Sequence, residues 1–190
     1  SLDADAMGAH AELMRTHALL GDQDAADEVA SQVRSLEGAY GYWTLRARFA
    51  LWRGDRALAA AHLARIQGDD PAAMRVPRLV RSVVAEGKIP EDEPPLEVIA
   101  TGAESGIRRR AFLLQIHAEM AAHLDEDART LEALRLAAEV GLVDLAWLER
   151  CPLFRRIRLS PRYYGIHALV KARAVEILEA YRRDAAPAMR

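Results

Sequence analysis

Apolar residues recur along the chain at intervals of three and four, with polar residues between them, over helix-length stretches. This spacing places apolar side chains on one face of a helix and predicts α-helices rather than strands. In the first segment the apolar stripe contains Leu13, Met14, His17 and Leu20. An all-α chain of roughly ten helices is therefore predicted, at about 4–20, 25–36, 40–53, 56–67, 76–86, 96–102, 107–124, 129–140 and 161–183, with one or two helical turns between 144 and 154.

Three glycines punctuate the first half of this pattern at a constant interval. Gly21, Gly54 and Gly87 are 33 residues apart, and each follows an apolar helical stretch. Glycine adopts the left-handed conformation that commonly ends a helix, so we expect a turn at each position. Asp24 is expected to cap the helix after the first turn. The third turn leads into an acidic, proline-rich loop at 88–95, where the pattern is interrupted.

The segment from Tyr42 to Pro71 resembles a tetratricopeptide repeat, a helix–turn–helix unit of about 34 residues. The family's aromatic, small, turn and closing positions are matched here by Trp43, Ala47, Gly54, Asp55, Ala59, Leu63 and Pro71, while Ile66 stands where alanine is usual. The resemblance implies a right-handed α-solenoid of stacked helical hairpins in one domain, residues 1–190. Its units would be about 7–38, 40–71, 73–105 and 111–142, with a long C-terminal capping helix within 144–183. The alternative is an irregular helical bundle.

A second resemblance lies further along the chain, at Gly141, Asp144, Trp147, Pro152, Pro161 and Tyr163. These positions resemble the C-terminal end of tetratricopeptide regions in large bacterial signalling proteins, including serine/threonine kinases, nucleotide cyclases and transcriptional regulators. The chain begins with serine, and we expect it to be a regulatory C-terminal fragment of such a longer protein.

Candidate binding residues follow from the same repeat. The residue six before each turn glycine is an arginine, namely Arg15, Arg48 and Arg81. The inner wall of such a solenoid would bring them near an exposed Trp52, and their guanidinium groups would bind carboxylates of an extended peptide. The other expected wall residues are Thr44, Gln115, Glu119 and His123. The alternative is a structural arginine ladder, salt-bridged to neighbouring repeats.

Charge and composition narrow the classes of function. The net charge is −2, but residues 151–190 carry +6, so a nucleic-acid-binding repeat using the basic C-terminal cap is the alternative function. The single Cys151 excludes an intramolecular disulfide and favours a reducing compartment. No apolar run reaches 18 residues, so we expect a cytoplasmic protein without a membrane span.

No catalytic motif is present in the sequence. Walker, GxGxxG and GxSxG patterns are absent, and His117 and His123 lack the HExxH spacing of a metal site. We therefore expect no enzyme activity, no cofactor, no metal and no small-molecule substrate. The expected function is that of a protein–protein interaction module whose partner is a protein or peptide, acidic in the favoured case. Self-association as a homodimer stays open.

Overall fold

The computed structural model describes residues 4–32, 40–68, 70–103 and 105–185, and all regular structure within these ranges is helical. The prediction of an all-α chain is confirmed. The helices are α1 (Ala4–Leu20), α2 (Gln23–Gln32), α3 (Tyr40–Trp52), α4 (Arg56–Leu63), α5 (Pro71–Glu86), α6 (Leu96–Thr101), α7 (Ile107–His123), α8 (Asp127–Val140), α9 (Leu145–Arg150) and α10 (Pro161–Ala185), with 3₁₀ turns η2 (Pro152–Phe154) and η3 (Ile157–Leu159). The expected end of the 25–36 helix lies outside the described residues.

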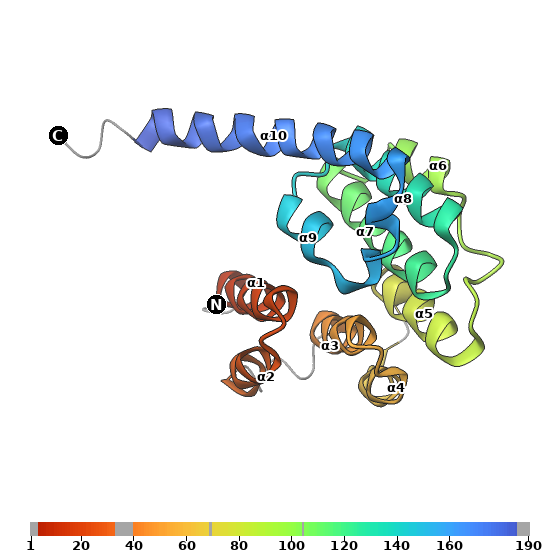
Figure 1. The fold of residues 1–190 in the computed structure, drawn as a ribbon. Helices are drawn as coiled ribbons and strands as arrows, with labels where there is room; N and C mark the ends of the chain where they lie inside the picture. Colours follow the sequence, from red (N-terminus) through yellow and green to blue (C-terminus); the bar gives the residue numbers. More distant parts are fainter. Residues whose placement is uncertain (1–3, 33–39, 69, 104, 186–190) are drawn as a thin grey trace. The chain divides into compact units, whose positions relative to one another are not determined.

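The chain forms two compact units (Figure 1). The first unit comprises Ser1–Glu93 with Arg150–Pro152, and the second comprises Pro94–Glu149 with Leu153–Arg190. In the first unit α1 packs against α2 and α3 against α4, while α3 also contacts α1 and α5. In the second unit α7 packs against α8, α6 contacts both of them, and α10 lies along α8. Antiparallel helix pairs are thus the building blocks of both units.

The same turn closes three of these helix pairs. Its first residue has a positive φ, at 79° for Gly21, 76° for Gly54 and 61° for Asp125. In each turn this residue donates its backbone N–H to the carbonyl three residues back, and the next residue donates to the carbonyl five residues back. These bonds are Gly21–Ala18, Gly54–Leu51 and Asp125–Ala122 for the first kind, and Asp22–His17, Asp55–Ala50 and Glu126–Ala121 for the second. The repeated turn expected at Gly21 and Gly54 is confirmed.

Asp125 takes the glycine position of this turn in the α7–α8 pair. It has the positive φ that side-chain-bearing residues rarely adopt, and aspartate is one of the few that tolerate it. At the remaining periodic glycine, Gly87, φ is 70° and the N–H bonds to Val83 O, which ends α5. Another helix pair does not follow directly, because the loop at 88–95 intervenes.

Aspartates cap the helices that follow the turns. Asp55 accepts a hydrogen bond from Leu58 N at 2.9 Å at the start of α4, and Asp22 accepts one from Ala25 N at 3.2 Å near the start of α2. The prediction that Asp24 caps the second helix is wrong, because the chain becomes helical at Gln23 and places Asp24 inside the first turn. Asp70 caps α5, which begins at Pro71 rather than near residue 76 as expected.

Replacing Asp55 by alanine is expected to lower the free energy of unfolding by about 1 kcal/mol, since the change leaves a helix N–H without its acceptor. Chemical denaturation monitored by circular dichroism measures the loss. Asp24→Ala is the matched control, because this aspartate is only part of a first helical turn, where its contribution is about 0.5 kcal/mol. Equal losses in the two variants would contradict the capping role of Asp55.

In the helix pair α3–α4, the positions where the repeat pattern expects a small or a large apolar residue are buried. Trp43 is 7% exposed and Ala47 and Ala59 are fully buried, as the repeat pattern predicts. In α1 the expected stripe is only partly right. Met14 is buried, but Leu13 and Leu20 are exposed, because Ala18 and Leu19 occupy the packing face of the last turn instead.

The acidic loop at 88–95 is tied to α5 by ion pairs and a hydrogen bond. The side chain of Glu93 is 1% exposed, and its Oε1 lies 2.8 Å from Nη2 of Arg75. The buried Ser82 hydroxyl donates to the carbonyl oxygen of Lys88 at 3.0 Å. Since a buried carboxylate is stable only when it is paired, Arg75 holds the loop in place.

Helix α10 packs only along its N-terminal part. Tyr163, Ile166 and Val170 are buried, whereas Ile177 and Tyr181 on the continuation of the same stripe are exposed. Arg173 fixes the helix where the burial ends, by donating to the carbonyls of Ala138 and Leu142 at 2.8 Å each. These bonds occupy acceptors at and just beyond the C-terminus of α8.

Candidate functional site

Each of the three periodic arginines interacts with the chain itself. Arg15 Nη2 lies 2.6 Å from Oε2 of Glu12, and Arg81 Nη2 donates to the carbonyl of Leu63 at 3.0 Å. Arg48 is 6% exposed, with its Cζ 5.9 Å from the centre of the Trp52 ring. The guanidinium groups of Arg15 and Arg81 therefore have internal partners, and Arg48 is buried.

Trp52 and Thr44 are buried with Arg48 on α3. Trp52 is 5% exposed and packs against Phe49 with ring centres 4.9 Å apart, so the expectation of an exposed Trp52 is wrong. The helical repeat correctly placed Trp52 beside Arg48, but it could not show that this side of the helix is covered. Thr44 is 6% exposed.

The remaining expected site residues lie on α7 in the second unit. Glu119 is completely buried, and its Oε1 accepts a hydrogen bond from Trp147 Nε1 at 2.7 Å. Gln115 and His123 are half-buried. Glu119 therefore belongs to the interior of the second unit, where it holds Trp147.

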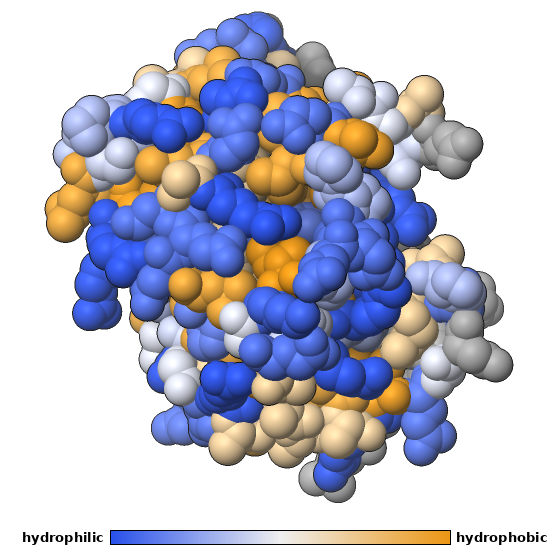
Figure 2. All heavy atoms as spheres, turned by 90° about the vertical axis from the view of Figure 1, so that its right-hand side faces the viewer, coloured by the Kyte–Doolittle hydropathy of each residue, from blue (hydrophilic) through white to orange (hydrophobic). Residues whose placement is uncertain are grey.

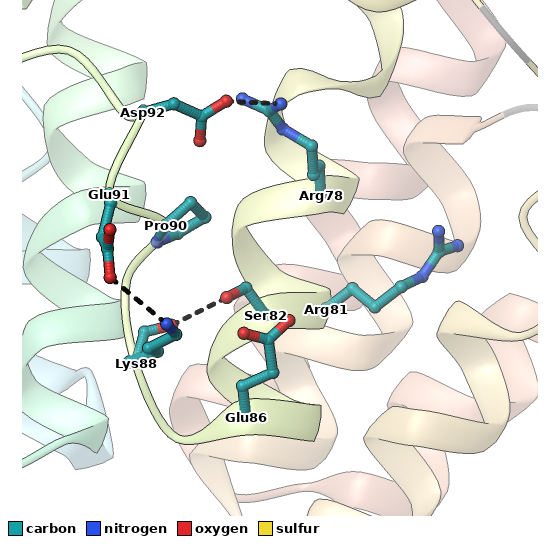
Figure 3. Close-up of a pocket in the computed structure, with 8 residues that line it drawn as sticks. All are labelled: Arg78, Arg81, Ser82, Glu86, Lys88, Pro90, Glu91 and Asp92. Atoms are coloured by element: carbon teal, nitrogen blue, oxygen red, sulfur yellow. Dashed lines mark hydrogen bonds and ion pairs between the residues drawn. The ribbon is translucent and has the colours of Figure 1, made fainter.

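A cavity of about 420 Å³ lies between α5 and the acidic loop (Figure 3). Four of its charged lining residues form two ion pairs. Arg78 contacts Asp92 at 3.0 Å, and Lys88 approaches Glu91 at 3.5 Å. The side chain of Arg81 extends away from the loop in Figure 3, toward its partner Leu63 O. This cavity therefore offers a ligand little uncompensated charge.

A second cavity, of about 320 Å³, lies in the groove between α2 and α4, with α3 as its floor. We call it the Trp43 pocket. Its aromatic and charged lining residues are Asp27, Tyr42, Trp43, Arg46, His62 and Arg65. All of them belong to the first unit.

The Trp43 ring organises this pocket. His62 stacks on it with ring centres 5.6 Å apart and an interplanar angle of 26°. The guanidinium carbon of Arg65 lies 4.7 Å from the ring centre, a cation–π contact. Tyr42 meets the ring edge-on and donates its hydroxyl to Ala30 O at 3.3 Å. These contacts fix the positions of the polar groups on the pocket wall.

The electrostatic balance of the Trp43 pocket is positive. Arg46 Nη1 pairs with Asp27 Oδ1 at 2.5 Å. Among the residues that the structure describes, Arg65 forms no ion pair with a carboxylate, whereas its guanidinium lies over the Trp43 ring. The pKa of His62 is lowered to about 4, mainly by burial and also by the charges of Arg46 and Arg65, while Asp27 opposes them. The imidazole is therefore neutral near pH 7, and Arg65 supplies the excess charge.

Three arginines of the basic C-terminal segment have partners within the second unit. Arg156 contacts Asp125 at 2.9 Å and Asp127 at 2.6 Å, and Arg162 lies 3.7 Å from Glu132. The Arg173 guanidinium bonds to helix carbonyls. Such neutralised arginines contribute less to phosphate binding than free ones do.

The described part of the chain contains no cluster of three or more metal-ligating side chains. Within the same residues, no helix combines the length and hydrophobicity that a membrane span requires. On the face drawn in Figure 2, hydrophobic residues lie in small groups among hydrophilic ones.

The molecule that these observations define is an all-α protein of antiparallel helix pairs with a cationic, aromatic pocket. No protein-family model, no curated protein and no solved structure matches the chain.

Sequence reasoning missed the polar part of the Trp43 pocket. Two pairs spaced by three residues carry it, Trp43 with Arg46 on α3, and His62 on α4 with Arg65 in the turn that follows α4. Such a spacing places both members of a pair on one side of a helix, and the helix predicted at 56–67 includes both His62 and Arg65. That signal was present in the sequence, but the pairing of α3 with α4 was needed to show that the two pairs meet.

Proposed function

We propose that the chain is a non-catalytic protein-interaction module of the tetratricopeptide type. The repeated turn supports this, since α1–α2, α3–α4 and α7–α8 are closed by the same pair of backbone hydrogen bonds. A helical hairpin cannot bury its apolar face alone, and the contacts of α3 with α1 and α5 are those of stacked neighbours. A right-handed solenoid with α10 as its cap is part of this proposal.

The proposed binding site is the Trp43 pocket rather than the wall of periodic arginines. The observation that carries it is the guanidinium of Arg65, held against Trp43 beside a neutral imidazole. A fixed guanidinium binds carboxylates with two parallel hydrogen bonds and loses little side-chain entropy in doing so. The partner is therefore a protein segment with an acidic side chain that enters the groove between α2 and α4.

For the biological setting, the proposal keeps the expectation drawn from the sequence. We propose a regulatory region of a larger bacterial signalling protein, acting in the cytoplasm, with self-association as an open alternative to a different partner. No catalytic step and no cofactor enters the proposal.

Replacing Arg65 by alanine is expected to weaken binding of an acidic peptide about tenfold, because a charge-assisted hydrogen-bond pair is lost. The probe is a short fluorescent peptide of alternating glutamate and serine, and fluorescence anisotropy measures its affinity. The same peptide with glutamine in place of glutamate should bind weakly to the unmodified protein.

Arg182→Ala is the matched control, because Arg182 is exposed on α10 in the second unit. It removes the same charge from the molecule and should leave the affinity unchanged within about twofold. Equal weakening in both variants would reduce the effect to net charge and contradict a site at Arg65.

A further inference from the structure

One buried polar atom of the Trp43 pocket forms no hydrogen bond within the described part of the chain. His62 is 9% exposed, and its Nε2 is buried without a hydrogen-bond partner among the described residues. Buried polar groups of native proteins are nearly always hydrogen-bonded, because an unmade bond costs free energy. Since the imidazole also forms part of the pocket wall, the missing partner is a group that a ligand can supply.

Charged groups reach His62 from every element around it. Asp27 approaches from α2, Arg46 from α3, Arg53 from the turn before α4, and Arg65 from the residues after α4. Three of these four groups are cations. Burial is the largest cause of the low pKa of His62, about 4, and the three arginines add to it against Asp27. The free site therefore keeps the imidazole neutral.

We propose that His62 is the specificity-determining residue of this pocket: its Nε2 donates a hydrogen bond to the carboxylate that Arg65 binds, and the imidazole takes up a proton from solvent as the complex forms. No covalent bond is made or broken, and the ligand remains a carboxylate throughout. This inference rests on the proposed function, because it concerns the same acidic partner segment.

The direction of the effect follows from the charges. A carboxylate at hydrogen-bond distance favours the imidazolium and opposes the arginines, so binding raises the pKa of His62. The complex then binds more protons than the free protein between the bound pKa and about 4. Affinity must therefore increase as the pH falls through this window, provided that the ligand carboxylate stays ionised, which holds for glutamate above about pH 4.5.

The test measures affinity of the alternating glutamate–serine peptide between about pH 5.5 and about pH 7.5. If binding returns the His62 pKa to its ordinary value, the unmodified protein binds about tenfold more tightly at the lower pH. His62→Gln keeps an N–H donor but does not titrate, so its affinity should change by less than about twofold over this range. His62→Leu lacks the donor and should bind more weakly at both pH values.

Arg65→Ala is the matched control, because it should weaken binding while the pH dependence persists. An NMR titration of the His62 ring, with and without peptide, gives the pKa change directly in the unmodified protein and needs no variant. If the affinity does not depend on pH, or if His62→Gln also binds more tightly at the lower pH, the inference is overturned and the proposed function still stands. If the unmodified protein fails to bind the peptide at any pH, the proposed function is contradicted instead.

Discussion

Replacing Trp147 by alanine is expected to lower the free energy of unfolding by about 4 kcal/mol, the largest effect that we expect from a single substitution in this chain. Trp147 is completely buried in the second unit and meets Phe154 edge-on, with ring centres 4.9 Å apart. Its removal leaves a cavity and deprives the buried Glu119 carboxylate of a hydrogen bond of 2.7 Å. Both losses act in the same direction.

Denaturant unfolding followed by circular dichroism measures this loss of stability. Two further variants, one at the same position and one at an exposed aromatic residue, serve for comparison. Trp147→Phe keeps an aromatic ring but removes the N–H donor and part of the ring volume, so its loss combines the lost hydrogen bond, about 1–3 kcal/mol, with a smaller cavity than the one that alanine leaves. Tyr181→Ala removes an aromatic ring that is 71% exposed on α10 and should change stability by less than about 0.5 kcal/mol. A loss below about 1 kcal/mol for Trp147→Ala would contradict the packing described for the second unit.

Acid should destabilise the protein through His62. The pKa of this imidazole is about 4 in the folded chain and about 6.5 in an unfolded one, so the unfolded state binds the proton more readily. The stabilising effect of the neutral imidazole is complete above about pH 6.5 and is lost as the pH falls toward 4. The loss between about pH 7.5 and about pH 4.5 should be about 2 kcal/mol.

Unfolding of the unmodified protein and of His62→Gln at both pH values checks this expectation. Glutamine does not titrate, so the variant should lose about 2 kcal/mol less than the unmodified protein when the pH is lowered. The quantity compared is the change with pH, which removes any constant cost of the substitution. Identical acid losses in the two proteins would show that His62 is not the titrating group.

Local sequence signals were sufficient for much of the fold. Gly21 and Gly54 predicted their turns because few other residues adopt a positive φ without strain. Ala59 predicted a close helix contact because larger side chains do not fit there, and it is fully buried. These features depend on residues within one helix pair, where spacing along the chain determines position in space.

The candidate site is formed by contacts between helices, which the spacing of residues along the sequence does not determine. Periodicity placed Arg48 and Trp52 together on α3 but did not show what covers that face, and both are buried. Conversely, Arg65 follows α4 in a short irregular segment, and only the packing of α4 on α3 brings it over Trp43. Residues on different helices become neighbours through tertiary packing, which the sequence pattern alone did not resolve.

The turn shared by three helix pairs has a consequence for how such turns can be recognised in a sequence. Two copies use glycine and one uses Asp125, yet all three keep the same backbone path. What the three turns share is therefore a backbone conformation, which glycine and, at one position, aspartate can adopt. A search for further turns of this kind must therefore compare backbone torsion angles and hydrogen bonds, because a search for glycine alone would miss the turn at Asp125.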